Sequence, residues 1–162
     1  MTDTLWLDAT EQQAWRTVLR HSVLLLDRLD DELRSEHGIG LADYEILVQL
    51  SEADAHRLRM SELADQALVS RSRLTHRVDR LAAEGLVTRE PCPTDRRGMY
   101  AVLSSKGEAL LDRAAPTHVA GVRRYLIDPL DPSTQRALVS QLAPPLAELE
   151  EAGVVTGCDE QA

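Results

Sequence analysis

Positively charged and hydroxyl side chains gather between residues 70 and 97 of this 162-residue chain. The residues that could contact a polyanion are Ser70, Arg71, Ser72, Arg73, His76 and Arg77, followed by Arg96 and Arg97. Arginine donates hydrogen bonds in a planar fork that fits phosphate oxygens and the edge of guanine, and serine bonds to phosphates and bases. The chemistry that this cluster favours is therefore the binding of duplex DNA.

One face of a predicted helix over residues 70–84 is apolar. Three residues repeat there at helical spacing, and they are Leu74, Val78 and Leu81. Ser70 suits the N-cap, and Gly85 suits the position after the helix, where a positive φ is common. A helix with an apolar back and a cationic front is what binding in a DNA major groove requires.

The neighbouring elements predict how this helix is positioned. A shorter amphipathic helix is predicted at residues 60–67, and the few residues between the two helices give the spacing of a helix-turn-helix. Two strands are predicted at residues 86–90 and 98–103, with a polar turn at 91–97 that carries two arginines. A helix-turn-helix followed by such a hairpin is a winged helix.

This segment resembles the multiple antibiotic resistance regulator (MarR) family of bacterial winged-helix repressors. The resemblance rests on Leu63-Ala64, Val69-Ser70-Arg71-Ser72, Val78-Asp79-Arg80-Leu81, Gly85-Leu86-Val87 and Asp95-x-Arg97-x5-Leu103-Ser104-x-x-Gly107. Ser104 stands where the family usually has Thr, and Ala101 where it more often has Val or Ile. Outside the winged helix the resemblance extends over roughly residues 11–150 by pattern and length.

The resemblance implies roles for residues that spacing alone does not assign. Arg97 is expected to enter the minor groove, where a narrow groove attracts arginine, while Asp95 orients the wing by an ion pair. Arg96 is expected at a phosphate. The family commonly has a pocket for a phenolic or other aromatic effector, and the residues that could line it here are Trp15, His21, Tyr44 and Tyr125. Each of these four could instead belong to the core.

Long helices are predicted on both sides of the winged helix. In chain order the predicted helices cover about residues 11–36, 41–50 (the first helix of the winged helix itself), 104–127 and 132–150, with Thr10 as the first cap. Pro116 and Gly121 are expected to bend or loosen the third helix, and Pro144-Pro145 to interrupt the fourth. The apolar stripe of the first helix is wider than one packing partner needs, so these helices are expected to pack against a second copy of the chain.

The predicted fold class is mainly α with a small β-hairpin. The whole chain is expected to form one domain, divided into a winged helix (41–107), dimerisation helices (9–37 and 108–150) and a tail (151–162). The net charge is −9, yet residues 70–97 hold seven arginines against four acidic residues. Because phosphate responds to the field within a Debye length of about 8–10 Å, this local surplus matters more than the total.

Several functional classes are disfavoured by the sequence. Two cysteines (Cys92 and Cys158) form no disulfide framework, and no leader or membrane span is predicted, so a cytoplasmic location is expected. The five histidines lack metal-ligand spacing, and no nucleophile motif or Gly-rich phosphate loop occurs, so no metal, cofactor or enzymatic activity is expected.

The predicted function is that of a homodimeric transcription regulator, a ligand-responsive repressor of a palindromic operator. Two alternatives from other classes stay open at this point. The winged helix could dock an acidic protein through its arginines, or the helical dimer could sequester or transform a ligand. Sequence-selective, salt-dependent binding of duplex DNA separates the regulator from the protein-docking module. The ligand-handling dimer would need an activity that survives Arg97→Ala and Arg73→Ala.

Overall fold

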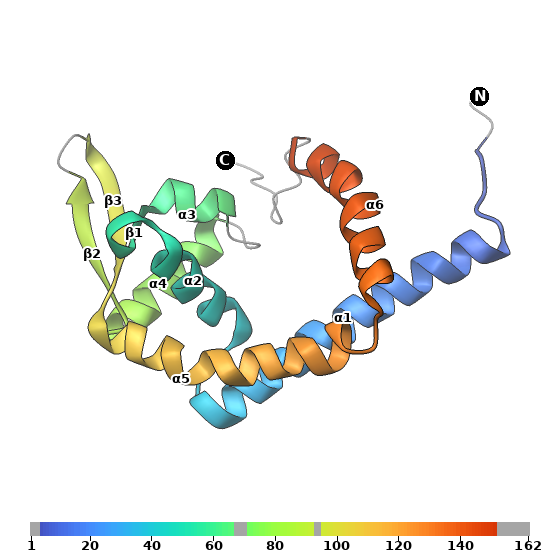
Figure 1. Cartoon of the computed structure of the whole chain (residues 1–162). Coiled ribbons are helices and arrows are strands. Elements are labelled where there is room, and N and C mark those ends of the chain that lie inside the picture. Colours follow the sequence, from blue (N-terminus) through green and yellow to red (C-terminus); the bar gives the residue numbers. More distant parts are fainter. Residues whose placement is uncertain (1–3, 67–70, 93–94, 152–162) are drawn as a thin grey trace.

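The computed structural model describes residues 4–66, 71–92 and 95–151, with the side chains of residues 65, 66, 71 and 95–97 outside the described part. In chain order its elements are α1 (Ala9–His37), α2 (Leu41–Glu52), η1 (Asp54–His56), β1 (Arg57–Arg59), α3 (Met60–Gln66), α4 (Arg71–Ala83), β2 (Val87–Cys92), β3 (Asp95–Leu103), α5 (Ser105–Val122), η2 (Arg123–Ile127) and α6 (Pro132–Glu151). Figure 1 shows the winged helix at one end of the long α1 and α5. The predicted mainly helical fold is confirmed.

The three strands form one antiparallel sheet in the order β1-β3-β2. Strand β1 is absent from the sequence-based prediction, which gives only two strands. Its Arg59 pairs with Tyr100 of β3, and its side chains are too polar to give a strand pattern. Strands β2 and β3 also extend further toward the wing tip than predicted, because backbone pairing continues through Pro91 with Met99 and Cys92 with Asp95.

A single apolar core joins the winged helix to the long helices. Its fully buried large side chains come from every helix from α1 to α4 and from β2, and include Leu33, Leu47, Leu63, Leu74 and Val87. Burying one such side chain stabilises the fold by about 1.5–3 kcal/mol. The core therefore fixes α4 against α2 and the sheet, leaving its other face to solvent.

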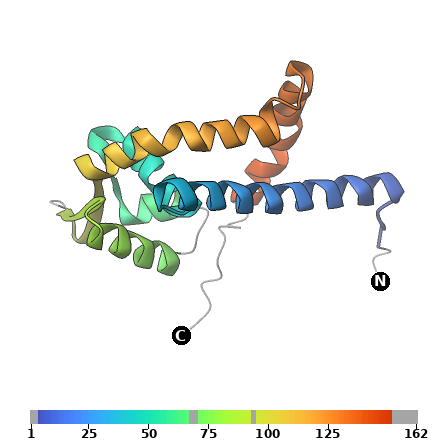
Figure 2. The same cartoon turned by 90° about the horizontal axis from the view of Figure 1, so that it is seen from below.

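Helices α1 and α5 lie side by side and run in opposite directions (Figure 2). The cap of α1 is Asp8, not Thr10: its side chain accepts a hydrogen bond from the Glu11 amide, and Glu11 accepts one from the Asp8 amide. Gly121 lies near the end of α5, which passes into the π-helix η2 at Arg123. A Cβ there would lie 2.6 Å from Cδ2 of Leu29, so this glycine permits close packing on α1.

The last helix, α6, stands away from the winged helix (Figure 1). It continues through Pro144 and Pro145, contrary to the predicted interruption. Proline fixes φ near a helical value, so the path is kept although two backbone N–H donors are lost. Within α6 none of the described residues is buried. No helix among the described residues is long and apolar enough to cross a membrane.

Candidate DNA-binding surface

Helix α4 presents two different faces, as its sequence predicts. Leu74, Val78 and Leu81 on its back are buried in the core. On its front, Ser72, Arg73 and His76 are exposed. Gly85, with φ of 72°, ends the turn after the helix in the left-handed conformation, and its amide donates to the Ala82 carbonyl. The front is therefore available to a ligand as large as a duplex.

The predicted contact residues fall into three groups. Ser72, Arg73, His76 and Arg77 lie on α4 with described side chains. Arg71 begins α4, and Asp95, Arg96 and Arg97 begin β3, but only their backbone is described. Ser70, the predicted N-cap, lies outside the described residues. The fold thus places those of the predicted residues that the structure describes at the start and front of α4 and at the start of β3.

Asp43 tethers α4 to α2, a contact that the sequence does not predict. It belongs to α2, is only 3% exposed, and accepts hydrogen bonds from the guanidinium groups of Arg77 (3.0 Å) and Arg80. Arg77, predicted at DNA, is thus held by a buried carboxylate in this structure. Arg80, one turn further along α4, pairs with the same carboxylate. No sequence spacing signals this contact, because 34 and 37 residues separate the partners.

A second ion pair joins α4 to the wing. Arg89 of β2 donates to Asp79 of α4 at 2.5 Å, and both side chains are partly exposed. On the strands, the guanidinium groups of Arg57 and Arg59 lie 5.0 and 5.8 Å from the ring centre of Tyr100. These contacts orient cationic side chains around the base of the wing.

Cys92 is buried at the end of β2, where its thiol donates to the Tyr100 hydroxyl at 3.9 Å. Burial limits the access of oxidants to this thiol. Among the described residues, no group of three or more His, Cys, Asp or Glu side chains could hold a metal ion.

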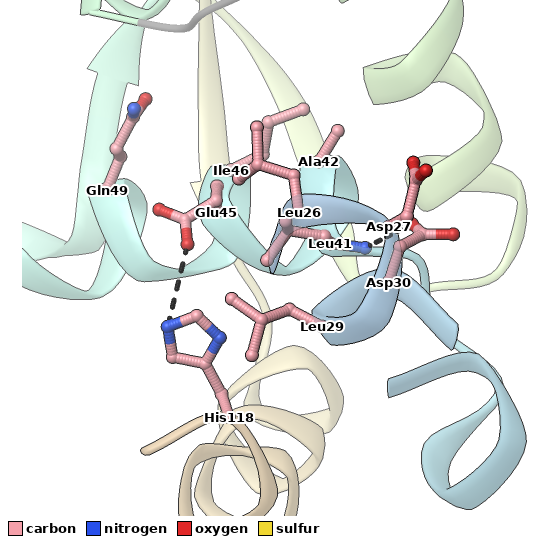
Figure 3. A pocket seen from close by; sticks show the side chains of 10 residues that line it. All are labelled: Leu26, Asp27, Leu29, Asp30, Leu41, Ala42, Glu45, Ile46, Gln49 and His118. Atoms are coloured by element: carbon pink, nitrogen blue, oxygen red, sulfur yellow. Dashed lines mark hydrogen bonds and ion pairs between the residues drawn. The ribbon is translucent and has the colours of Figure 1, made fainter. Parts of the chain in front are cut away.

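A cavity of about 730 Å³ lies on the other side of α2, between α1, α2 and α5 (Figure 3). Its lining is mostly apolar, with Glu45 of α2 and His118 of α5 facing each other 4.0 Å apart. Burial raises the pKa of Glu45 and lowers the pKa of His118. Both groups are therefore shifted toward their neutral forms.

The four predicted effector residues do not line this cavity together. Tyr44 is buried in the core, with its ring 4.7 Å from that of His118, and burial raises its pKa. The Tyr125 hydroxyl donates to Glu32, and its backbone carbonyl lies 3.1 Å from Nε2 of His21. Trp15 is 56% exposed on α1. Their role in ligand binding stays a prediction.

Known proteins share this arrangement. A MarR family model matches residues 37–98, which include α2, the helix-turn-helix and most of the wing. The regulator PecS of Dickeya dadantii is 32% identical over 64% of this chain and 63% of its own length, so the chain spans less than two thirds of that relative.

Two solved structures cover nearly the whole chain. AbsC of Streptomyces coelicolor, a MarR family transcriptional regulator, is 44% identical with a TM-score of 0.88, covering 91% of this chain and 99% of AbsC. Sco3205 of the same organism, a MarR family regulator solved in complex with DNA, is 42% identical with a TM-score of 0.85, covering 91% and 92%. The chain therefore belongs to the MarR family of winged-helix, DNA-binding transcription regulators, which are not enzymes.

Proposed function

We propose that two copies of this chain bind a palindromic operator and repress transcription until a small molecule releases them. The observation that carries this proposal is the exposed cationic front of α4 beside an arginine-bearing wing. Sco3205, its relative at 42% identity, has been solved in complex with DNA, which supports the same use of this surface.

Each residue has a distinct part in the proposed complex. Arg73 and His76 on the exposed front of α4 reach base edges, while Ser70, Arg71 and Ser72 at its start contact phosphates and bases. At the wing, Arg97 enters the minor groove, Arg96 meets a phosphate and Asp95 orients the loop. Arg77 contributes to DNA binding mainly through Asp43, which fixes the angle of α4.

The exposed apolar surface supports a dimer. Large apolar side chains of α1 and α6 are about half exposed, including Trp15, Val18, Leu142, Leu146 and Leu149. On α6, Leu138, Leu142, Leu146 and Leu149 repeat at helical spacing and form one stripe. An exposed apolar stripe on a helix is typical of a protein–protein interface. A two-fold dimer would place two copies of α4 about one helical turn apart on DNA.

The cavity supports a response to a ligand. Residues on one face of α2 line it, while Asp43 on another face of α2 holds α4. A ligand that favours a different position of α2 therefore changes the spacing of the two recognition helices. It can shift DNA binding only by its difference in affinity for the two arrangements.

Fluorescence anisotropy tests the DNA-binding surface. Wild type, Arg73→Ala and Arg97→Ala are titrated against the duplex upstream of the protein's own gene and against a scrambled duplex, at two salt concentrations. We expect selective binding by wild type, and losses of about tenfold or more in each variant, because each base contact contributes about 1–3 kcal/mol. A matched control, Arg136→Ala on α6, leaves affinity unchanged. If both variants bind like wild type, this surface is not the DNA-binding site.

A further inference from the structure

The cavity between α1, α2 and α5 combines an apolar floor with negative charge. Leu26 and Leu29 of α1 and Leu41, Ala42 and Ile46 of α2 form the floor, as Figure 3 shows. Asp27 and Asp30 of α1 lie at one side, and Glu45 of α2 lies at the other. None of the described lining residues is a lysine or arginine.

The carboxylates of the lining differ in how far hydrogen bonds and nearby positive charge balance them. Asp30 accepts hydrogen bonds from Arg34 and from the Leu41 amide, so its charge is already balanced. Glu45 lies 4.0 Å from Nε2 of His118, beyond hydrogen-bond length. Burial favours the neutral ring, so His118 supplies little positive charge at neutral pH. The Glu45 side of the cavity therefore lacks a cation.

Beside Glu45, the ring of His118 has a nitrogen that makes no hydrogen bond among the described residues. Its side chain is 18% exposed, and its Nδ1 is buried with no hydrogen-bond partner among the described residues. The ring is fixed by its contact with Tyr44. An unpaired buried nitrogen costs free energy, which a ligand or a water that bonds to it would recover.

We propose that the cavity binds a small organic cation, an amine or amidine on an apolar framework, with its charge at Glu45 and its body on the leucine and isoleucine floor. Charge complementarity carries this assignment. An aromatic anion of the phenolic type would meet Asp27 and Glu45 with no lysine or arginine in the lining to receive it. The cavity volume of about 730 Å³ suits a ligand of one or two rings.

The inference rests on the proposed ligand response and names its ligand class. Glu45 and Asp43 are two residues apart on α2, so they point to different sides of the helix. A cation at Glu45 acts on the side of α2 that faces α1 and α5. The opposite side carries the contact with Arg77 and Arg80 of α4. Binding in the cavity is thereby linked to the position of the recognition helix.

Direct binding to the full chain tests the ligand class without DNA. Three probes of equal size are titrated by calorimetry at neutral pH: 2-naphthylmethylammonium, 2-naphthylmethanol and 2-naphthoate. We expect the ammonium to bind about tenfold more tightly than the alcohol, the gain of one charge-assisted hydrogen bond, and the naphthoate to bind most weakly. Glu45→Gln should remove the preference for the ammonium, whereas Glu108→Gln, an exposed change on α5 outside the cavity, should keep it.

The outcomes separate this inference from the proposed function. Equal affinities for the three probes, a preference for naphthoate, or a preference for the ammonium that survives Glu45→Gln would overturn it. Absence of binding by every probe would also overturn it, and is expected if a second copy of the chain covers the cavity. A separate arm adds the ammonium to the protein–DNA complex. Binding without DNA release would support the ligand class and contradict the proposed response.

Discussion

Replacing Asp43 by Asn removes the charge that holds α4 while keeping the shape of the side chain. Breaking a fully buried ion pair costs about 3–5 kcal/mol, but here the arginines are partly exposed. The Arg77 side chain is 28% exposed, so its bond is valued near the lower end for a charged group, about 1.5 kcal/mol. The Arg80 side chain is 51% exposed, so its pair contributes about 0.5 kcal/mol after solvent screening. Asp43→Asn should therefore lower the free energy of unfolding by about 2 kcal/mol.

Thermal and urea unfolding measure this loss, which corresponds to a Tm lower by about 4–8 °C for a chain of this size. Asp79→Asn is the matched control, because Asp79 also pairs with an arginine, but its own side chain is 51% exposed whereas that of Asp43 is 5% exposed. Its cost should stay below about 1 kcal/mol. Asp43→Asn should also weaken operator binding in anisotropy, since α4 loses its anchor. Equal destabilisation by the two variants would refute the argument that burial makes Asp43 the main tether of α4.

Three further predictions concern packing, pH and assembly. Gly107→Ala should lower stability by about 1–3 kcal/mol in urea unfolding, because a Cβ would lie 2.2 Å from the Leu86 carbonyl oxygen; an unchanged midpoint would contradict this packing. Burial lowers the pKa of His118, so stability should fall as pH drops below the unfolded value of about 6.5, where the unfolded chain takes up the proton first. His118→Gln should flatten this decline, and the raised pKa of Glu45, which acts in the opposite direction, is common to both proteins; an equal slope in the two would contradict the prediction. Leu146→Glu should shift the chain from dimer to monomer in sedimentation velocity, and an unchanged mass would contradict the role of α6.

The regular spacing of apolar residues was the main basis for predicting the helices. The apolar stripe of Leu74, Val78 and Leu81 identified α4 because burial of one helix face leaves a regular trace in the sequence. Strand β1 shows no such apolar pattern, since Arg57 and Arg59 flank a single apolar residue. Its extended conformation depends on backbone pairing with β3. The prediction that the proline pair interrupts α6 was wrong, because proline constrains φ to a value that a helix can use.

The site was harder to predict than the fold wherever it depends on contacts between distant residues. The exposed cations of α4 can be identified from the sequence, because the apolar stripe fixes which face of the helix is buried. The residues off that stripe, here mostly cationic, must then lie on the exposed face. Asp43 cannot be identified in this way, since its role arises only when α2 packs against α4. The cavity likewise brings Glu45 and His118 together from helices that are far apart in the chain. Tyr44, expected as an amphipathic pocket residue, lies in the core beside that cavity.

Selection of binding sites from a random duplex library by the purified full-length chain tests the central claim most directly. The account predicts enrichment of one palindrome, with half-sites about one helical turn apart, because two copies of α4 must reach successive major grooves. Loss of this enrichment in Arg73→Ala would tie it to the front of α4. Recovery of no preferred sequence, or of a single half-site without symmetry, would contradict a dimeric regulator that recognises its operator through this surface.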